Sequence, residues 1–467
     1  MTRKAEAWLD FWTTRAFGLF VDAFVLGAAY VGAFALRFDF QTPRWGWRAV
    51  ALSFVTVCAA HLLALVAVGC YRMPWRRFSL GDLPRYFLAM GMACFVLTGL
   101  RVLMPVETFA HVRPPYSVTL MTFVLASIGI VGWRIVWSWY SFSKVQVDAL
   151  LERDVRRMDS AAATRFIRGK TVMVTGAGGS IGSELVRQVV RAEPRIVLMV
   201  ERCENALYEI DREIRQSGTD VTCLPLMVDI RDLDRMEELF MRHRPDVVLH
   251  AAAYKHVPMV EMNPMEGERN NTAATRDLAE LSRRHQVSRF VLISTDKAVN
   301  PVSVMGKTKL AAEKAIMALN AEGSQTSFCA VRFGNVLGSS GSVVPLFREQ
   351  IARKRPVTVT HPDMKRYFMT VQEAVGLVLQ AASRQERAIY TLDMGVPVRI
   401  LDLAEQMIRQ AGYKPYVDIP IVFTGIRPGE KLFEELDISE KSAYKTDMAR
   451  IYVTIASASC HGSLDSV

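Results

Sequence analysis

Four consecutive residues, Ser294-Thr295-Asp296-Lys297, bring together two hydroxyls, a carboxyl and an amine. Side chains of these types can donate and accept protons during a reaction. They end a short apolar run, residues 289–294, which we predict to be a strand of an open α/β sheet. Reactive groups collect at the carboxyl ends of such strands. An Asp-Lys pair is ordinarily a surface turn, but this position predicts acid–base chemistry.

A glycine motif lies directly after the first predicted strand of the same sheet, residues 170–175. Gly176, Gly179 and Gly182 are spaced G-x-x-G-x-x-G. Glycine suits the tight turn, the close approach of backbone to a pyrophosphate, and the packing of the following helix, whose N-terminus faces the phosphates. A lone motif is weak evidence, but its place between strand and helix predicts a dinucleotide site. We expect Ser180 and Ile181, inside the turn, to contact the cofactor as well.

Acidic residues follow the next two predicted strands. Glu201 lies about 20 residues after the glycines, where a carboxylate holds the adenosine ribose hydroxyls, and this favours NAD. Arg202 beside it is able to accept a 2′-phosphate, which leaves NADP open. Asp229 follows the third strand and is placed to reach the adenine, or alternatively to cap a helix. The remaining residues assigned to the cofactor are Ile230, Ala251 and Ala253.

A second reactive segment, Met305-Gly-Lys-Thr-Lys309, opens the helix predicted after the fifth strand. Residues four apart lie on one helix face. In short-chain dehydrogenases these two positions hold Tyr and Lys, and the cation lowers the pKa of the phenol. Methionine exchanges no proton. Another group must therefore deprotonate the substrate hydroxyl during hydride transfer.

The elements that position these residues alternate regularly along the chain. Short apolar runs separated by amphipathic helical stretches predict right-handed βαβ units and a parallel sheet with helices on both faces. The six predicted strands are 170–175, 195–200, 221–226, 247–250, 289–294 and 327–333.

The first 140 residues differ from the rest because apolar residues are concentrated there. Each of four stretches approaches the roughly 20 residues that a helix needs to cross a bilayer. A signal peptide would account for only one of them, and buried helices of a soluble bundle would be shorter with a polar face. We predict four spans, at Ala16–Leu36, Ala49–Cys70, Tyr86–Leu103 and Ser117–Trp139.

Basic residues near the span ends predict the orientation. This bias places the N-terminus and the large C-terminal part on the cytoplasmic side. The basic residues that flank the spans on that side are Arg3, Lys4, Arg15, Arg72, Arg76, Arg77, Arg85, Lys144, Arg153, Arg156 and Arg157. The opposite loops carry Arg44, Arg48 and Arg113. Asp22 lies inside the first span, where a charge is costly; it is either functional or paired with a basic residue.

Composition excludes other classes of function. The net charge of +10 comes from scattered Lys and Arg without a basic block or interleaved aromatic residues, so we expect no nucleic-acid partner. The seven cysteines form no C-x-x-C pair, which argues against a zinc site and a disulfide framework and is consistent with a reducing cytosol. We expect no metal.

The sequence resembles the nucleoside-diphosphate-sugar 4,6-dehydratases of bacterial polysaccharide biosynthesis, within the extended short-chain dehydrogenase/reductase superfamily, and specifically their membrane-anchored CapD-like branch. The resemblance covers roughly Lys170–Leu436. It depends on the glycine motif and on segments His250–Pro258, Ser294–Pro301, Arg332–Gly338 and Arg427–Phe433. Met305 also occurs in the larger members. They usually carry a further nucleotide-binding-like domain before the glycines, whereas only about thirty residues separate Trp139 from Lys170 here.

The resemblance implies UDP-N-acetylglucosamine as substrate and a 4-keto-6-deoxy sugar nucleotide as product. C4 is oxidised, the C5 proton is removed, the C6 hydroxyl leaves as water, and hydride returns to C6. Within this scheme Lys297 is the C5 base, Asp296 is the acid for the leaving hydroxyl, and Thr295 holds O4. Asp296 is also a candidate to take the O4 proton. Met305 implies retention of configuration at C5.

The resemblance also implies further contacts with cofactor and substrate. Lys309 would bind the nicotinamide ribose, Arg427 the diphosphate, for which its planar fork of donors is suited, and Glu430 a ribose. Asn335 lies near the diphosphate. Lys255 and His256 belong to the loop after the fourth strand, with a structural role for His256 equally open. Arg366 is a weaker candidate, with a salt bridge as its alternative.

These inferences give an α/β fold class: a four-helix transmembrane region, then a Rossmann-type doubly wound parallel sheet with a small C-terminal substrate-binding subdomain. We predict spans within 1–142, a linker at 143–168, a catalytic domain at 169–440 and a tail at 441–467. We expect a multi-pass protein of the bacterial inner membrane, a cytoplasmic catalytic domain, surrounding lipid and a homo-oligomer. Alternative functions are a UDP-sugar 4-epimerase, which needs no C5 base, and a non-catalytic dinucleotide-sensing scaffold.

Overall fold

The computed structural model describes nine segments of the chain and forms two compact units. One unit comprises residues 1–145 with 408–414, and the other comprises 146–407 with 415–467. The described residues are 3–39, 46–71, 82–103, 115–143, 160–320, 324–384, 386–436, 438 and 443–454.

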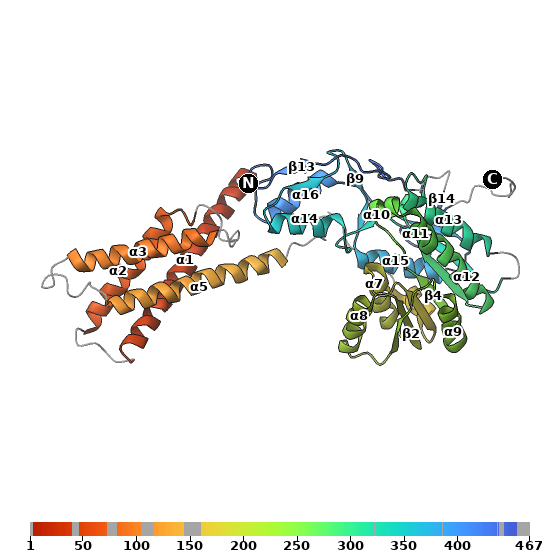
Figure 1. The fold of residues 1–467 in the computed structure, drawn as a ribbon, viewed down its shortest axis with the longest axis horizontal. Helices are drawn as coiled ribbons and strands as arrows, with labels where there is room; N and C mark the ends of the chain where they lie inside the picture. Colours follow the sequence, from red (N-terminus) through yellow and green to blue (C-terminus); the bar gives the residue numbers. More distant parts are fainter. Residues whose placement is uncertain are drawn as a thin grey trace. The chain divides into compact units, whose positions relative to one another are not determined.

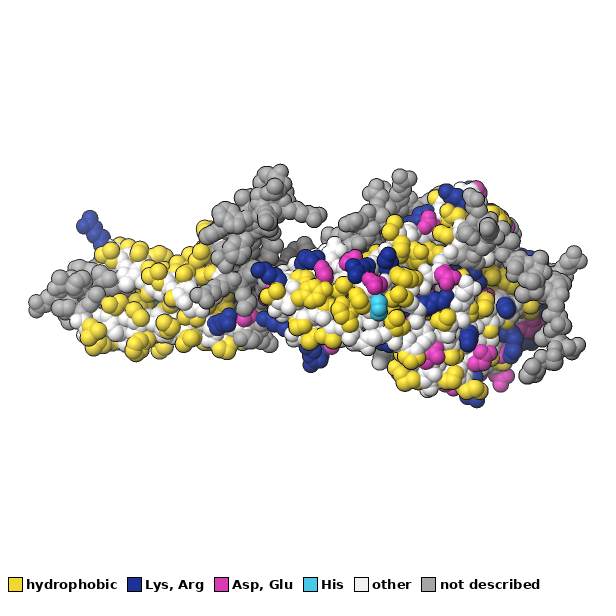
Figure 2. Space-filling model, turned by 90° about the horizontal axis from the view of Figure 1, so that it is seen from above, with side chains coloured by type: hydrophobic (Ala, Val, Ile, Leu, Met, Phe, Trp, Pro, Cys, Tyr) yellow, Lys and Arg dark blue, Asp and Glu magenta, His cyan; other side chains and the backbone are white. Residues whose placement is uncertain are grey.

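The N-terminal unit contains four long helices, α1 (Arg3–Arg37), α2 (Gly46–Ala67), α3 (Leu83–Leu103) and α5 (Tyr116–Ser143) (Figure 1). Each includes an apolar segment long enough to cross a membrane, at Ala16–Arg37, Trp47–Ala67, Leu83–Leu103 and Tyr116–Val136. Figure 2 shows mostly apolar side chains on the outer surface of these helices. An outer surface of large apolar side chains suits contact with lipid better than contact with water. The prediction of four apolar spans is confirmed.

Asp22 of α1 has a basic partner within this unit. Its Oδ2 lies 2.5 Å from Arg134 Nη2 of α5 and accepts a hydrogen bond of 2.6 Å from the Tyr71 hydroxyl. Both charged side chains are only 2% exposed. Of the two readings of Asp22, the structure supports the ion pair, which joins α1 to α5.

The second unit is built on a nine-stranded sheet ordered β14-β15-β11-β6-β5-β4-β1-β2-β3. The pairs from β3 through β2, β1, β4, β5 and β6 to β11 are all parallel. The first six strands lie within one residue of their predicted bounds: β1 (Thr171–Thr175), β2 (Ile196–Glu201), β3 (Thr222–Met227), β4 (Val247–His250), β5 (Arg289–Ile293) and β6 (Ser327–Arg332). The order reverses beside β1, as a doubly wound sheet requires.

Helices cover both faces of the sheet (Figure 1). Neighbouring residues of one strand point to opposite faces, so Val172 joins one core and Met173 the other. Because both faces of the sheet are buried, the sequences of these strands are continuous apolar runs. The first core includes α6 (Ser160–Ile167), α7 (Ser180–Arg191), α8 (Glu204–Gln216) and α15 (Val371–Ser383). The second includes α9 (Leu233–His243), α12 (Ala274–Arg284) and α13 (Val304–Ala318).

The sheet extends beyond the predicted end of the domain at residue 440. β11 (Ile389–Leu392) pairs antiparallel with β15 (Ile451–Thr454), which pairs antiparallel with β14 (Ala443–Lys445). Ile451 and Val453 alternate toward the core and are 0% and 4% exposed. The prediction of a C-terminal tail from residue 441 is therefore wrong for residues 443–454. Residues 455–467 of the predicted tail lie outside the described residues.

Three small two-stranded sheets and two helices, within residues 335–423, lie outside the nine-stranded sheet. The pairs are β7 (Asn335–Val336) with β10 (Phe368–Met369), β8 (Val357–Val359) with β13 (Ile421–Phe423), and β9 (Lys365–Arg366) with β12 (Val398–Arg399). The helices are α14 (Val343–Ala352) and α16 (Ile400–Gln410).

Candidate active site

A cleft of about 940 Å³ opens at the carboxyl ends of the parallel strands. Its lining comes from the glycine turn after β1, the loop after β4, the end of β5, one face of α13 and the segment after β6. Thr358–Thr360, Arg366 and Arg427 of the small C-terminal part line the remaining side. This is the position at which open α/β sheets bind ligands.

Most of the predicted site residues line this cleft. They are Gly179, Ser180, Ile181, Gly182, Ala251, Ala253, Lys255, His256, Thr295, Lys297, Met305, Lys309, Asn335, Arg366, Arg427 and Glu430. Five others do not belong to its lining: Gly176, Glu201, Asp229, Ile230 and Asp296. Ile230 is only 5% exposed and packs in a sheet core, which argues against direct contact of its side chain with a cofactor.

The glycine turn has the geometry that its sequence predicts. Gly176 has φ +67°, and a Cβ on this residue would lie 2.8 Å from the Ala252 backbone. A Cβ on Gly182 would lie 1.9 Å from the Gly176 carbonyl oxygen. Gly179 caps the twelve-residue helix α7 and lines the cleft. Open backbone at a helix N-terminus fits a pyrophosphate, so these residues suit the predicted dinucleotide.

Asp296 and Lys297 form a hydrogen-bonded pair at the end of β5. Asp296 Oδ1 accepts hydrogen bonds from Lys297 Nζ at 3.0 Å and from the Thr295 hydroxyl at 2.9 Å. The Asp296 side chain is 1% exposed and that of Lys297 is 19% exposed. Asp296 Oδ2 is buried without a hydrogen-bond partner. Lys297 and Thr295 therefore face the cleft, with the Asp296 carboxyl directly behind them.

Two further groups approach the Lys297 ammonium. Nζ donates to Asn335 Oδ1 at 3.3 Å and lies 3.8 Å from Glu434 Oε1. Asn335, predicted to bind the diphosphate, lines the cleft and accepts a hydrogen bond from Lys297. Glu434 was missed because it lies far along the chain, just beyond the Arg427–Phe433 motif, and no spacing links it to Lys297.

Met305 and Lys309 share one face of α13. Met305 is 3% exposed, packs with Val257 and Val260, and lines the cleft. Lys309 also lines the cleft, and burial lowers its pKa to about 8. Glu313 opposes this shift of the Lys309 pKa through its negative charge. The helix therefore presents an apolar group and a titratable amine to the cleft.

The loop between β7 and α14 contacts the glycine turn. Lys255 Nζ donates to the Ser340 carbonyl at 2.7 Å, and the Ser340 N–H donates to Ser180 Oγ at 3.1 Å. The His256 ring lies against Gly341, where a Cβ would be 2.5 Å from its Cε1. Burial lowers the pKa of Lys255, and burial with the nearby Lys255 lowers that of His256. The packing of His256 supports its structural reading.

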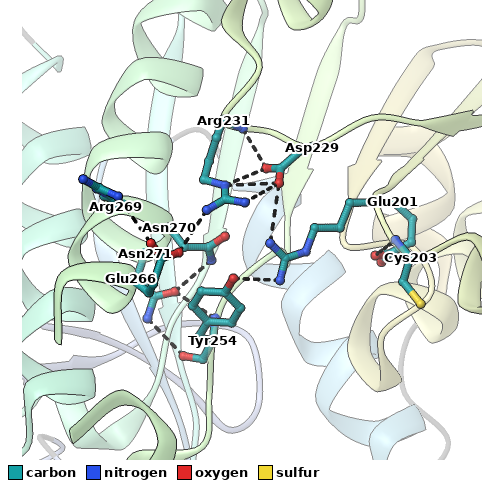
Figure 3. A network of polar contacts seen from close by, with 10 residues as sticks. Glu201, Cys203, Asp229, Arg231, Tyr254, Glu266, Arg269, Asn270 and Asn271 are labelled. Carbon is teal, nitrogen blue, oxygen red and sulfur yellow. Dashed lines mark hydrogen bonds and ion pairs between the residues drawn. The ribbon is translucent and has the colours of Figure 1, made fainter. Parts of the chain in front are cut away.

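Polar contacts link the ends of β2, β3 and β4 (Figure 3). The Glu201 carboxylate accepts hydrogen bonds from the Gly178 N–H at 3.2 Å and the Cys203 N–H at 2.9 Å. Arg202 donates to the Tyr254 hydroxyl at 2.8 Å and lies 3.5 Å from Asp229 Oδ2. Arg202 is thus already held by two partners in this network.

Asp229 lies between two guanidinium groups (Figure 3). Its Oδ2 accepts a hydrogen bond of 2.7 Å from Arg231, and this bond is the main cause that lowers the Asp229 pKa to about 2. The carboxylate is therefore ionised at neutral pH. The alternative that Asp229 caps a helix is wrong, because Asp232 caps α9 and accepts from the Arg235 N–H.

Asn271 holds the loop after β4 through hydrogen bonds to the Tyr254 backbone (Figure 3). It accepts from the Tyr254 N–H at 2.8 Å, donates to the Tyr254 carbonyl at 3.0 Å and donates to the Thr308 hydroxyl at 3.2 Å. Asn271 is fully buried in a π-helical turn, Glu268–Ala273, a rare geometry that is frequent at functional sites. Sequence reasoning missed Asn271, because no motif spacing marks it.

The basic and acidic candidates of the C-terminal part differ in their surroundings. Arg366 donates to the carbonyls of Lys365, Leu432 and Lys431 and lies 3.9 Å from Glu434 Oε1. These contacts support its salt-bridge reading. Arg427 is exposed at the cleft, while Glu430 Oε2 is buried without a hydrogen-bond partner.

No group of three or more His, Cys, Asp or Glu side chains that could hold a metal ion occurs among the described residues.

Comparisons with known sequences cover the second unit. Residues 172–456 match the family model described as polysaccharide biosynthesis protein. The capsular polysaccharide biosynthesis protein CapD of Staphylococcus aureus is 51% identical over 298 residues, which are 63% of this chain and 50% of CapD. This chain thus spans about half the length of that relative. The UDP-N-acetylglucosamine 4,6-dehydratase (inverting) of Campylobacter jejuni is 32% identical over 62% of this chain and 83% of its own.

Solved structures share the fold of the second unit. Pen from Bacillus thuringiensis is 32% identical, with a TM-score of 0.57 over 62% of this chain and 90% of its own. The dTDP-glucose 4,6-dehydratase DesIV of Streptomyces venezuelae, solved with NAD and TYD bound, has a TM-score of 0.50 at 19% identity over 56% of this chain and 86% of its own. At that identity the likeness shows the fold alone.

Proposed function

The chain belongs to the polysaccharide biosynthesis protein family, and from this membership we propose that it is a membrane-associated, NAD-dependent UDP-N-acetylglucosamine 4,6-dehydratase. Its product would be a UDP-4-keto-6-deoxy-N-acetylhexosamine for glycan synthesis. The observation that carries the proposal is the Asp296–Lys297 pair at the cleft, with Met305 in place of a tyrosine. Elimination of water needs an acid and a base, and this pair supplies both.

NAD is the proposed cofactor, and its pyrophosphate would lie on the glycine turn at the N-terminus of α7. Two acidic side chains, Glu201 and Asp229, favour NAD over NADP. Glu201 is anchored beside the turn, and Asp229 carries a negative charge next to Arg202. A 2′-phosphate would face both acidic side chains, and Arg202 would have to leave Asp229 and Tyr254 to bind it. DesIV, which shares the fold, was solved with NAD.

Bound NAD would accept hydride from C4 and return it to C6. Thr295 would hold O4 by a hydrogen bond, and Asp296 would take the O4 proton through its contact with the Thr295 hydroxyl. The C4 ketone acidifies the C5 proton, which Lys297 would remove as its neutral amine and return to C5 when hydride reaches C6. Asp296, protonated by then, would pass the O4 proton to the departing C6 hydroxyl through the Thr295 hydroxyl, because Asp296 itself does not line the cleft. Met305 would add an apolar wall that excludes water from the sugar.

The substrate assignment follows from the dehydratase of Campylobacter jejuni that is 32% identical to this chain. Arg427 would bind the diphosphate, since a planar guanidinium matches phosphate oxygens. Glu430 would accept a hydrogen bond from a ribose hydroxyl, which would give its buried Oε2 a partner. Retention at C5 stays a proposal that rests on Met305.

A 4-epimerase is the second candidate function. It would use the same cofactor, the same C4 hydride step and the same cleft, but it would have no need of a base at C5. The placement of Lys297 at the cleft, 3.0 Å from Asp296 Oδ1, favours dehydration over epimerisation.

The four apolar helices associate the protein with a membrane, and we propose the bacterial inner membrane with the catalytic unit in the cytoplasm. The bias of Arg and Lys toward one set of loops supports this orientation. UDP-sugars and NAD are available there, and product would form next to membrane-bound acceptors. We also propose that the protein forms a homo-oligomer.

Incubation of the detergent-solubilised full chain with UDP-N-acetylglucosamine and NAD tests the proposal by mass spectrometry. We expect a nucleotide sugar lighter by one water. A sugar isomer of unchanged mass would identify an epimerase. Sustained net formation of NADH would indicate a simple dehydrogenase, and binding of NAD without any turnover would indicate the scaffold.

A further inference from the structure

Glu434 is a buried carboxyl beside two residues that line the cleft, Lys297 and Arg366. Its side chain is 4% exposed, although Phe433 before it is 48% exposed and the Glu435 side chain after it is 56% exposed. Burial of a lone carboxylate is costly, and such groups are retained where they are paired or have a function. The segment that carries Glu434 is fixed, because Arg366 donates hydrogen bonds to the carbonyls of Lys431 and Leu432.

Four charged groups surround Glu434. Its Oε1 lies 3.8 Å from Lys297 Nζ and 3.9 Å from Arg366 Nη2. Asp296 and Lys431 also act on it electrostatically. Lys297 therefore lies between two carboxyls, Asp296 and Glu434, of which only Asp296 is within hydrogen-bond distance.

The arrangement of Lys297 raises a problem for its proposed chemistry. An ammonium that contacts carboxylates keeps its proton, but a base must be neutral before it removes the C5 proton. The proton therefore needs an acceptor other than Asp296, which serves O4 and the leaving hydroxyl. Glu434 is the nearest other carboxyl, and contacts of this kind commonly shorten once substrate binds.

We propose that Glu434 is a positioning residue that accepts a proton from Lys297 and so sets this amine in its basic form for C5. The step balances: the Lys297 N–H bond breaks, a Glu434 O–H bond forms, and the freed nitrogen lone pair then takes the C5 proton. When hydride reaches C6, Lys297 returns the proton to C5, and Glu434 then returns its own proton to the Lys297 amine, which restores the starting state. This inference rests on the proposed dehydratase function.

The electrostatics of the site support this role. Burial raises the pKa of Glu434, and Asp296 adds to the rise, while Lys297, Arg366 and Lys431 oppose it. A carboxyl with a raised pKa accepts a proton from an ammonium more readily than an ordinary glutamate does. Turnover should therefore fall as the pH drops through the raised pKa of Glu434, where the carboxyl is already protonated.

The test compares Glu434→Gln and Glu434→Asp with the wild-type full chain, using UDP-N-acetylglucosamine and NAD. Glu435→Gln is the matched control, because this neighbour is exposed and contacts Asn300 and Lys431 away from the pair. We expect E434Q to lower kcat about 10²-fold, a size typical of lost acid–base assistance. In a single turnover, NADH should form at the wild-type rate and then accumulate. E434D should restore part of kcat and the acidic limb that E434Q loses.

The outcomes separate the two claims. Wild-type kcat and pH profile in E434Q would overturn the role of Glu434 while leaving the dehydratase intact. Equal loss of NADH formation and of product, with an unchanged pH profile, would assign Glu434 a structural role only and also overturn the inference. A wild-type chain that releases no product lighter by one water would overturn the proposed function itself.

Discussion

Lys297 is the residue on which the proposed chemistry converges. It contacts Asp296 and Asn335, approaches Glu434, and is the amine of the pair that faces the cleft. The sequence predicted the Asp296–Lys297 pair and its place at a strand end. It did not predict Asn335 or Glu434 as neighbours of Lys297, because side chains about 40 and 140 positions away meet it only through the tertiary fold.

Replacement of Lys297 with Ala should abolish most turnover and leave NAD binding intact. We expect kcat to fall by about 10²–10⁴-fold, the usual contribution of a positioned base. Lys307→Ala, an exposed lysine on α13, is the control and should retain wild-type kcat. Steady-state kinetics and NAD titration by fluorescence provide the two readouts. Unchanged turnover in K297A would eliminate the assignment of the base.

Lys309 should make NAD binding depend on pH. Burial lowers its pKa to about 8, so the ammonium predominates below that pH and the neutral amine above it. A cationic Lys309 would donate to the nicotinamide ribose hydroxyls of the proposed cofactor and add positive potential, so the affinity for NAD should decrease as the pH rises through about 8. Lys309→Gln should bind weakly at every pH. A variant that keeps the wild-type pH dependence would show that another group titrates.

At the scale of elements, the parallel sheet and its glycine turn were predictable because each depends on local pattern. Apolar runs gave the six strands, and glycine spacing gave the turn between β1 and α7. β14 and β15 were not predicted, because a short antiparallel strand at a sheet edge has little sequence signal before its partner β11 is known. The π-helical turn that carries Asn271 likewise depends on packing against α13.

Gly182→Ala should displace the start of α7 and abolish NAD binding. Its new Cβ would lie 1.9 Å from the Gly176 carbonyl oxygen, which is backbone and cannot rotate away. Overpacking of this kind costs about 1–3 kcal/mol, so the melting temperature should also drop. Ser183→Ala, one residue further along α7, should leave both properties near wild type. NAD affinity in G182A equal to wild type would contradict the role of the turn.

At the scale of the whole molecule, one chain combines an apolar four-helix unit with an α/β unit that carries the cleft. Hydropathy predicted the four spans, since the bilayer thickness fixes their length. Hydropathy did not decide whether Asp22 is functional or paired, because the partner of Asp22, Arg134, lies 112 positions away. The resemblance predicted the family, and the match over residues 172–456 confirms it.

The Asp22–Arg134 pair should stabilise the membrane unit. Asp22→Ala leaves a buried guanidinium without its carboxylate, and Arg134→Ala leaves the opposite charge alone. Loss of one partner of a buried pair costs about 3–5 kcal/mol, so either single variant should melt well below wild type in detergent. The double variant should lose less than the sum of the two. Additive losses would show that the two residues act independently.

The proposed enzyme moves hydride from C4 to C6 of the sugar while water is eliminated. The most direct test supplies UDP-N-acetylglucosamine deuterated at C4 and locates the label in the product by NMR. We predict deuterium in the C6 methyl group of a 4-keto sugar, with the cofactor oxidised at the end of each cycle. Label returned to C4 in an epimerised sugar, or retained on released NADH, would contradict the account.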